Sequence, residues 1–421
     1  MWALISHSPL LSAISFPNLS AINNLEVLAF YLICCLTVVA GYSLTYLIWR
    51  WIPYQNKIIF TILFLSVAEY IRGFILSLLF WGHESTVGIS DATFSVANAL
   101  SMTPLLSLAY FGHIYYLSFI LSLIIICLHN KKLPAMLILI ILISLQIFYV
   151  YYKNLVYQER EKLVGGSNYP DINMLIIPTH MPTHIDTTQM QLQNIYNKAN
   201  KENDQRLDYI IKNNQDANLV ILPETIIYKP SLNTKIKYKG PPILQGLVAT
   251  DTDKKTKLIN ASLYIDPQSG ITIRKKSYLF PFYEYRPYLS PINSASSFSF
   301  GSSTPTDFYT DINKINFLNL PEREKIYRWT TMICSEFFYF DYIKDLKNKN
   351  YDLIFAQSSF SIFNQSRWMY AIILMSQKIN SAYIGVPLIQ VSNDGPSFVI
   401  KNNKLIYFEE KSQPFTINVD K

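Results

Sequence analysis

The chain has 421 residues, of which 50% are hydrophobic and only 15% are charged. Soluble globular proteins carry about 25% charged residues, so this composition argues against a purely soluble protein and favours one with membrane segments. The net charge of +7 is modest, and no basic stripe is interleaved with stacking aromatic residues, which argues against nucleic-acid binding.

Apolar segments dominate the chain up to about residue 153. Crossing a bilayer takes about 20 apolar residues, and four segments are long enough, at 27–49, 58–81, 106–128 and 134–152. The first 25 residues lack the positively charged start of a signal peptide, so we expect them to lie at the membrane interface or partly inserted. We therefore predict a bundle of about four transmembrane helices over residues 1–153 and a second domain over residues 154–421.

The loops between these segments alternate in charge. Lys and Arg occur in the loops at 50–57 and 129–133, whereas the loop at 82–105 contains neither. Cytoplasmic loops are enriched in Lys and Arg, so we expect the two basic loops in the cytoplasm. The second domain would then face the opposite side, which is the periplasm if the membrane is the inner membrane of a Gram-negative bacterium.

The second apolar segment carries two opposite charges. Glu69 and Arg72, in LSVAEYIRGF, are three residues apart and so share one face of a helix. Charges at this depth are costly unless they are paired or turned towards protein or water. We favour a structural ion pair, and contact with a lipid head group is the alternative interpretation.

The second domain has the pattern of an α/β fold. Fully apolar strands that alternate with helices are typical of sheets covered on both faces. The predicted helices lie at 188–214, 337–347 and 366–381, and the predicted strands lie at 173–178, 219–223, 243–249, 261–266, 330–334, 353–357 and 388–392.

Cysteine and histidine usage argues against disulfide and metal sites. Three of the four cysteines lie in apolar membrane segments, and Cys334 has no evident partner, so no disulfide framework is predicted. His180 and His184 have helical spacing, but a proline separates them and no carboxylate motif accompanies them. We expect no metal ion and no cofactor.

Three residues at or just beyond predicted strands could act together. Glu224 follows LVILP, Lys276 stands in RKKSYLFPFYEYRP, and Cys334 ends TTMIC. A carboxylate can take the proton of a thiol, the thiolate can attack a carbonyl carbon, and an ammonium group can stabilise the resulting oxyanion. Taken singly, each residue has a plainer reading, because a lone cysteine usually packs in a core and a lone Glu or Lys usually lies on a solvated face.

The segments around these residues resemble the carbon–nitrogen hydrolase (nitrilase) superfamily. Within it, KSYLFPFYEYRP (276–287) is similar to KxxLVPFGEYxP of the apolipoprotein N-acyltransferase family. The other similar segments are AEYIRGF (68–74), PLLSLAYFGHIYYLSFI (104–120), INASLYI (259–265) and QVSNDGPS (390–397).

The resemblance implies a fold, a reaction and roles for residues. The fold would be an αββα nitrilase-like sandwich attached to the transmembrane bundle. Glu224 would be the general base, Lys276 the oxyanion stabiliser and Cys334 the nucleophile, with Glu284 and Glu336 as supporting acids. The reaction would move an acyl chain from a phospholipid, through a Cys334 thioester, to the terminal amine of a lipoprotein.

Several features depart from the family pattern and keep alternatives open. Ser335 stands where Tyr is usual after the nucleophile, Tyr283 replaces a Gly, and members usually have more apolar spans. A membrane-anchored amidase, in which water resolves the thioester, is one alternative. Another is a non-catalytic component of a conjugal-transfer (TraB-type) or envelope assembly that keeps the fold.

Overall fold

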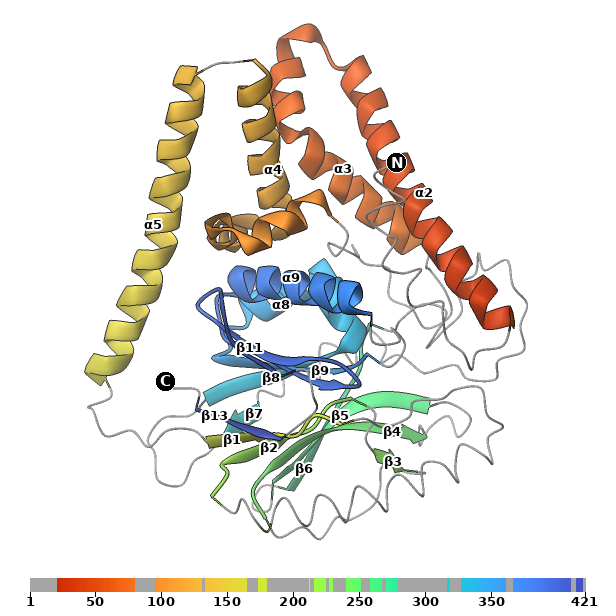
Figure 1. Ribbon diagram of the computed structural model, residues 1–421, viewed down its shortest axis with the longest axis vertical. Helices are drawn as coiled ribbons and strands as arrows, with labels where there is room; N and C mark the ends of the chain where they lie inside the picture. Colours follow the sequence, from red (N-terminus) through yellow and green to blue (C-terminus); the bar gives the residue numbers. More distant parts are fainter. Residues whose placement is uncertain are drawn as a thin grey trace.

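The computed structural model describes most of both halves of the chain (Figure 1). The described residues are 21–79, 95–130, 133–164, 173–179, 212, 216–224, 227–229, 240–250, 258–266, 270–278, 316–318, 327–360, 366–409 and 414–418. The predicted helix at 188–214, apart from Lys212, and the predicted supporting residue Glu284 lie outside these ranges.

Four long helices form the described part of the first half. They are α2 (Ala21–Trp51), α3 (Lys57–Leu79), α4 (Ala109–His129) and α5 (Leu133–Val164). Short 3-10 helices η1 (Tyr54–Asn56), η2 (Val96–Met102) and η3 (Pro104–Leu108) join them. α2 packs against α3, and α3 packs against α4. Among the described residues, three segments are long and apolar enough to cross a membrane, at Tyr31–Trp51, Tyr54–Leu79 and Pro104–His129.

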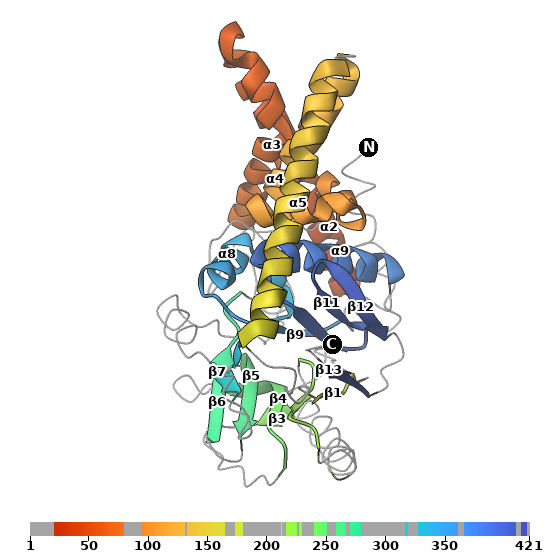
Figure 2. The same cartoon turned by 90° about the vertical axis from the view of Figure 1, so that its left-hand side faces the viewer.

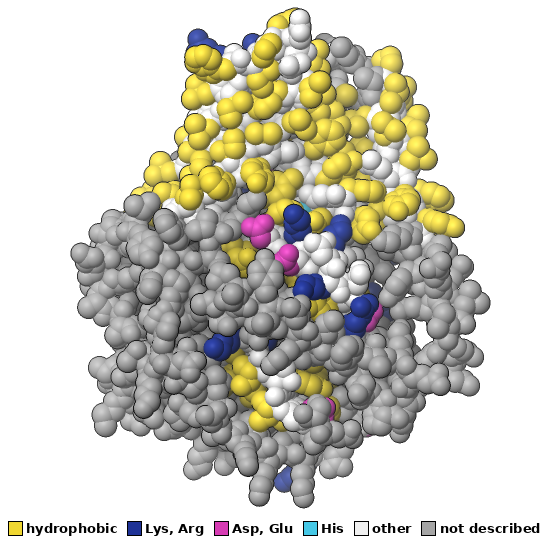
Figure 3. Space-filling model, turned by 180° about the vertical axis from the view of Figure 1, so that it is seen from behind, with side chains coloured by type: hydrophobic (Ala, Val, Ile, Leu, Met, Phe, Trp, Pro, Cys, Tyr) yellow, Lys and Arg dark blue, Asp and Glu magenta, His cyan; other side chains and the backbone are white. Residues whose placement is uncertain are grey.

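These three segments coincide with three of the four predicted spans and have the length and composition to cross a membrane. The fourth prediction, 134–152, falls in α5, whose apolar part Leu137–Tyr152 is shorter than the other three. α5 also continues past residue 153 to Val164, so the predicted domain boundary falls inside a helix. Figure 3 shows a hydrophobic band over these helices, with Lys and Arg side chains at its upper end and charged side chains below it. This distribution suits helices surrounded by lipid.

Seven strands form the first sheet of the second half. The order is β13-β1-β2-β4-β5-β6, and β3 pairs with β4. The central strands β1, β2 and β4 are parallel, and β5, β6 and β13 add antiparallel strands at the edges. The strands are β1 (Asn173–Ile176), β2 (Leu219–Ile221), β3 (Ile227–Lys229), β4 (Ile243–Thr250), β5 (Leu258–Asp266), β6 (Gly270–Lys275) and β13 (Phe415–Asn418).

The second sheet has six strands in the order β12-β11-β10-β9-β8-β7. Its centre, β8, β9 and β10, is parallel, and β7, β11 and β12 are antiparallel. The strands are β7 (Asn316–Leu318), β8 (Tyr327–Ile333), β9 (Leu353–Ser359), β10 (Leu388–Asn393), β11 (Ser397–Lys401) and β12 (Lys404–Glu409). α8 (Phe340–Asn348) follows β8, and α9 (Arg367–Ile384) follows β9.

The two sheets stack face to face, and α8 and α9 cover the outer face of the second sheet (Figures 1 and 2). Strand β9 shows why its sequence is apolar throughout. Leu353 and Phe355 join the core between the sheets, whereas Ile354 and Ala356 join the core under the helices. Side chains alternate between the faces of a strand, and both faces of β9 are buried. The α/β fold is therefore confirmed, with two stacked mixed sheets and one described helical layer.

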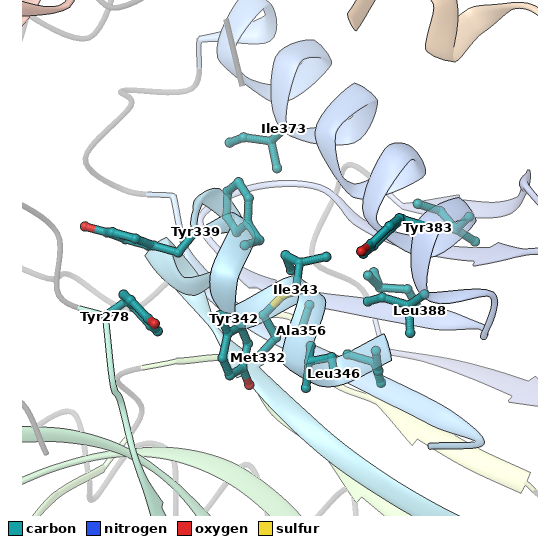
Figure 4. Packing of buried hydrophobic residues seen from close by; sticks show 14 of the residues in the cluster. Tyr278, Met332, Tyr339, Tyr342, Ile343, Leu346, Ala356, Ile373, Tyr383 and Leu388 are labelled. Atoms are coloured by element: carbon teal, nitrogen blue, oxygen red, sulfur yellow. The ribbon is translucent and has the colours of Figure 1, made fainter. Parts of the chain in front are cut away.

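The core under α8 and α9 also reaches the membrane helices. Figure 4 shows its centre, where α8, α9 and the second sheet meet around Tyr342, Ile343 and Leu388. Tyr31 and Cys34 of α2 belong to the same buried cluster. The two halves of the chain are thus joined by a shared hydrophobic core.

Candidate active site

Glu224 lies three residues after β2 and is almost completely buried, with 3% of its surface exposed. Three groups in the described part of the chain donate hydrogen bonds to its carboxylate. Asn260 Nδ2 and Lys276 Nζ lie 2.5 and 3.1 Å from Oε1, and the backbone N–H of Ser359 lies 2.9 Å from Oε2. Burying a charge is costly unless it is paired and hydrogen-bonded. The arrangement satisfies both conditions, so it can hold an ionised carboxylate in the interior.

Lys276 directly follows β6, and its side chain is 1% exposed. Its ammonium group forms an ion pair with Glu224 at 3.1 Å, and its backbone N–H donates to the Asn260 carbonyl at 2.7 Å. Asn260 therefore contacts both members of the pair and fixes their relative position. The structure brings these two predicted residues into direct contact.

Cys334 directly follows β8 and begins the 3-10 helix η4 (Cys334–Phe338). Its φ of 43° is in the left-handed region, which residues other than Gly adopt rarely and which occurs often at functional sites. The neighbouring residues Ser335 and Glu336 are fully buried, whereas Cys334 is partly exposed. The turn therefore presents the thiol-bearing residue while its neighbours are fixed inside.

Glu336 ties the segment of Lys276 to the segment of Cys334. Its Oε1 accepts the backbone N–H of Ser277 at 2.7 Å, and its Oε2 accepts the backbone N–H of Ile333 at 2.7 Å. These two donors belong to residues adjacent to Lys276 and to Cys334. A second link joins the same segments, because Ser335 Oγ donates to the Tyr278 carbonyl at 2.6 Å.

The charge of Glu336 is balanced by Arg274, which the sequence analysis did not single out. Arg274 Nη2 lies 2.9 and 2.8 Å from the two carboxylate oxygens and 2.7 Å from Tyr342 Oη. Burial alone would lower the pKa of Arg274, but the negative charge of Glu336 raises it above its ordinary value. Burial raises the pKa of Tyr342. Arg274 therefore stays positively charged beside the Glu336 carboxyl group, and Tyr342 stays a neutral phenol.

A sequence signal for Arg274 does exist. Residues two apart in a strand face the same side, and Arg274 in β6 is two positions before Lys276. Once Lys276 is taken as a site residue, a second buried cation on the same face is expected. The signal is weak, because surface strands also carry alternating cations.

Strand β9 connects Glu224 to β8, the strand that directly precedes Cys334. β8 pairs with β9, with Ile333 opposite Gln357. Gln357 Nε2 donates to the Leu222 carbonyl at 2.6 Å, two residues before Glu224, and Ser359 at the end of β9 donates to Glu224 itself. Glu224, Lys276 and Cys334 thus come from segments that are hydrogen-bonded to one another.

Glu69 and Arg72 lie in α3, in the membrane half, and not in this cluster. Arg72 Nε is 2.8 Å from Glu69 Oε2, and Tyr42 Oη of α2 donates to Glu69 Oε1 at 3.0 Å. Both charged side chains are buried. The geometry is that of an ion pair within the helices, and a role in binding a lipid head group stays a prediction. Among the described residues, no group of three or more His, Cys, Asp or Glu residues could hold a metal ion.

Comparison with known proteins gives structural matches only. No family model and no curated protein matches the chain. A carbon–nitrogen hydrolase from Helicobacter pylori G27 is 13% identical with a TM-score of 0.41, over 59% of this chain and 89% of that one. Nit3 of Saccharomyces cerevisiae, a member of branch 10 of the nitrilase superfamily, is 12% identical with a TM-score of 0.39, over 59% and 91%.

A third match is an amidase of the nitrilase superfamily from Nesterenkonia AN1. It is 11% identical with a TM-score of 0.36, over 60% of this chain and 91% of that one. Similarity at this level assigns no role to any residue of this chain.

Proposed function

We propose that this protein is a membrane acyltransferase of the carbon–nitrogen hydrolase (nitrilase) superfamily that carries an acyl group on Cys334. One observation carries the proposal. A buried Glu224–Lys276 ion pair, 3.1 Å apart, is tied through Glu336 to the turn that presents the partly exposed Cys334. The resemblance of KSYLFPFYEYRP (276–287) to the apolipoprotein N-acyltransferases supports the same assignment.

The first half-reaction loads the thiol. Glu224 takes the proton of Cys334, and the thiolate attacks the ester carbonyl of the donor. The ammonium group of Lys276 stabilises the oxyanion of the tetrahedral intermediate. The carbon–oxygen bond of the ester then breaks, and the leaving alkoxide accepts from Glu224 the proton that Cys334 gave up. The products are a Cys334 thioester and a lysolipid alcohol.

The second half-reaction moves the acyl group to an amine. The neutral amine attacks the thioester carbonyl, Lys276 again stabilises the oxyanion, and the carbon–sulfur bond breaks. Glu224 receives the proton that the nitrogen loses and returns it to the Cys334 thiolate. The product is an amide, and the enzyme regains its starting state without a cofactor.

The substrates in this proposal are a phospholipid and the terminal amine of a lipoprotein. A lipid donor suits a chain in which α8 and α9 connect the sheet bearing Cys334 to apolar helices (Figure 2). The pattern of Lys and Arg in the loops supports placing the catalytic domain on the periplasmic face of a bacterial inner membrane.

A transfer assay with defined substrates tests the proposal. The purified protein would be placed in vesicles that contain a phospholipid with an isotope-labelled acyl chain, together with a synthetic diacylglyceryl-cysteine peptide. We expect labelled N-acyl peptide and lysophospholipid with the wild type and neither with Cys334→Ala. Labelled free fatty acid without N-acyl peptide would favour an amidase or hydrolase. No labelled product under conditions in which a known N-acyltransferase acts would contradict the proposal.

A further inference from the structure

Helix α4 is broken near its start, at Gly112 and His113. Gly112 has φ −170° and ψ 32°, and His113 has φ 57° and ψ −146°. The conformation of His113 is sparsely populated for any residue other than Gly, so the surrounding structure must hold it. No proline stands at this point of the sequence. The cause of the break therefore has to be sought in what His113 contacts.

His113 contacts the second domain. Its ring is 2% exposed and lies 5.2 Å from the ring of Phe340 in α8 and 5.2 Å from that of Tyr383 in α9. Its Nε2 is 2.8 Å from Asn380 Oδ1 in α9. Because the Asn380 amide uses Nδ2 as a donor elsewhere, its Oδ1 is the acceptor and His113 Nε2 carries the proton. His113 Nδ1 has no hydrogen-bond partner within the described part of the chain.

Asn380 passes this contact on to the turn that carries the thiol. Its Nδ2 donates to the Phe337 carbonyl at 3.1 Å, and Phe337 belongs to η4, which begins at Cys334. Two hydrogen bonds, both through one buried amide, thus connect a transmembrane helix to the candidate nucleophile's own turn. The three residues in this connection, His113, Asn380 and Phe337, belong to three different elements, α4, α9 and η4.

Lys347, near the end of α8, makes a second contact between the same two parts. Its ammonium group donates to the Tyr110 carbonyl, three residues before His113. It also lies 4.3 Å from the centre of the Tyr110 ring and 3.9 Å from that of Tyr383. A cation between two aromatic faces is attracted to both. The second domain therefore contacts the broken start of α4 at two points, Tyr110 and His113.

We infer that His113 and Asn380 are positioning residues, which set the Cys334 turn relative to the membrane helices so that the thiol meets an acyl donor lying in the bilayer. The inference rests on the proposed function. Neither residue touches the reacting atoms. Their effect should therefore depend on where the donor is, since a soluble donor can diffuse to the thiol but a lipid donor reaches it only from the membrane.

The experiment compares full-length wild type, His113→Phe and His129→Phe in phospholipid vesicles. Phe at position 113 keeps a ring for packing but leaves Asn380 Oδ1 without its donor. His129 ends the same helix and is exposed, so the same substitution there is the matched control. Acylation of Cys334 is followed by peptide mass spectrometry with a vesicle phospholipid and, separately, with a short-chain water-soluble ester. His113→Gln, which keeps an N–H donor, tests for rescue.

We expect His113→Phe to slow acylation from the phospholipid by about tenfold or more, since small displacements of a reacting group have large effects on rate. The soluble ester should acylate wild type and variant within about twofold of each other, with kcat rather than KM changed for the lipid donor. His129→Phe should match wild type, and His113→Gln should recover most of the lost rate. Equal slowing with both donors would overturn the inference, because it would indicate general damage to the site.

A second readout does not depend on catalysis. Alkylation of Cys334 by a long-chain maleimide dissolved in the vesicles is compared with alkylation by water-soluble N-ethylmaleimide. The ratio of the first rate to the second should fall in His113→Phe, and in Asn380→Ala if the first variant does not fold. An unchanged ratio would overturn the positioning role. A wild-type protein that neither donor acylates would contradict the proposed function, and the maleimide ratio would still decide the positioning role.

Discussion

Cys334 occupies a left-handed backbone position at the end of a buried strand, between residues that are fully buried. Ile333 and Ser335 on either side are held by hydrogen bonds to Glu336 and to the Tyr278 carbonyl. Hydrogen bonds therefore fix the residues on both sides of Cys334, the candidate nucleophile. In the proposed function, the Glu224–Lys276 pair would supply the acid–base and electrostatic groups that a thiol nucleophile needs.

Replacing Glu224 tests its role as the general base. Glu224→Gln keeps an oxygen to accept the Ser359 N–H bond but cannot take up a proton. General-base catalysis contributes about 100- to 10,000-fold to rate, so acylation of Cys334 should slow by about that factor. The measurement is the initial rate of acylation by mass spectrometry. Glu409→Gln, at the end of the edge strand β12, is the control and should leave the rate unchanged.

Replacing Lys276 tests the buried ion pair by its stability. Lys276→Met leaves the Glu224 carboxylate buried without its cation, which typically costs about 3–5 kcal/mol of unfolding free energy. Denaturant unfolding of the protein in detergent would measure the loss. The double variant with Glu224→Gln should be more stable than the sum of the two single losses predicts, because no uncompensated charge remains. Strict additivity would contradict direct pairing.

At the scale of elements, strand β6 is fastened to η4 by the buried pair of Arg274 and Glu336. Arg274 Nη2 lies 2.8 Å from Glu336 Oε2, and the same carboxylate binds backbone N–H groups of both segments. This link joins an edge strand of the first sheet to the end of a central strand of the second sheet. The position of Lys276 relative to Cys334 therefore depends on this carboxylate, together with the Ser335–Tyr278 hydrogen bond.

Two matched substitutions of arginine test this link. Arg274→Met removes the cation from a buried pair and should cost about 3–5 kcal/mol of unfolding free energy. Arg328→Met removes the cation from a half-exposed pair, whose atoms lie 4.0 Å apart, and should change stability by no more than about 1 kcal/mol. Unfolding curves of both variants decide the matter. Similar losses for the two would contradict the structural role given to Arg274.

The contact between α2 and α3 depends on a residue without a side chain. A Cβ added at Gly41 would lie 2.9 Å from Arg72 Cβ and 3.0 Å from the Ala68 carbonyl oxygen. Gly41→Ala should therefore separate the helices and cost about 1–3 kcal/mol by overpacking. We expect a lower midpoint of thermal unfolding in detergent, whereas Ser43→Ala, at an exposed position of α2, should leave it unchanged. A Gly41→Ala protein as stable as wild type would show that α2 and α3 are less closely packed.

Strands were predictable where both faces are buried, because such strands are apolar throughout. All seven predicted strands overlap an observed one, and the predicted helices at 337–347 and 366–381 correspond to α8 and α9. Strands β3, β6, β7, β11, β12 and β13 were missed, since they are short or carry polar residues. The turn at Asn402 and Asn403, with φ of 51° and 64°, is a hairpin signal that could have revealed β11 and β12.

The residues of the candidate site were predictable only from segments that resemble a known family, and their contacts were not. The contact between Glu336 and the segment of Lys276 could not be derived from the sequence. The two residues of the Ser277–Glu336 hydrogen bond are 59 positions apart in the chain. Arg274 was missed because its sequence signal, a place two positions before Lys276 along β6, is weak. Its charge needs an explanation only once burial is known.

In the whole molecule, the α/β domain and the long apolar helices form one packed unit. Residues of α2 and α3 share a core with α8, α9 and the second sheet, and His113 and Lys347 add polar contacts at the same junction. This arrangement suits an enzyme whose donor is a membrane lipid. If the proposed function holds, the acyl chain of the donor would stay in the apolar layer while its ester reaches the domain.

The central claim is that Cys334 accepts an acyl group from a phospholipid. The most direct measurement is site-resolved mass spectrometry of the full-length protein after incubation in vesicles with a phospholipid that carries a labelled acyl chain. We expect a labelled acyl mass on the Cys334 peptide that hydroxylamine removes, and no such mass in Cys334→Ser. A label on Cys127 alone, or an unlabelled Cys334 where a known acyltransferase is labelled, would contradict it.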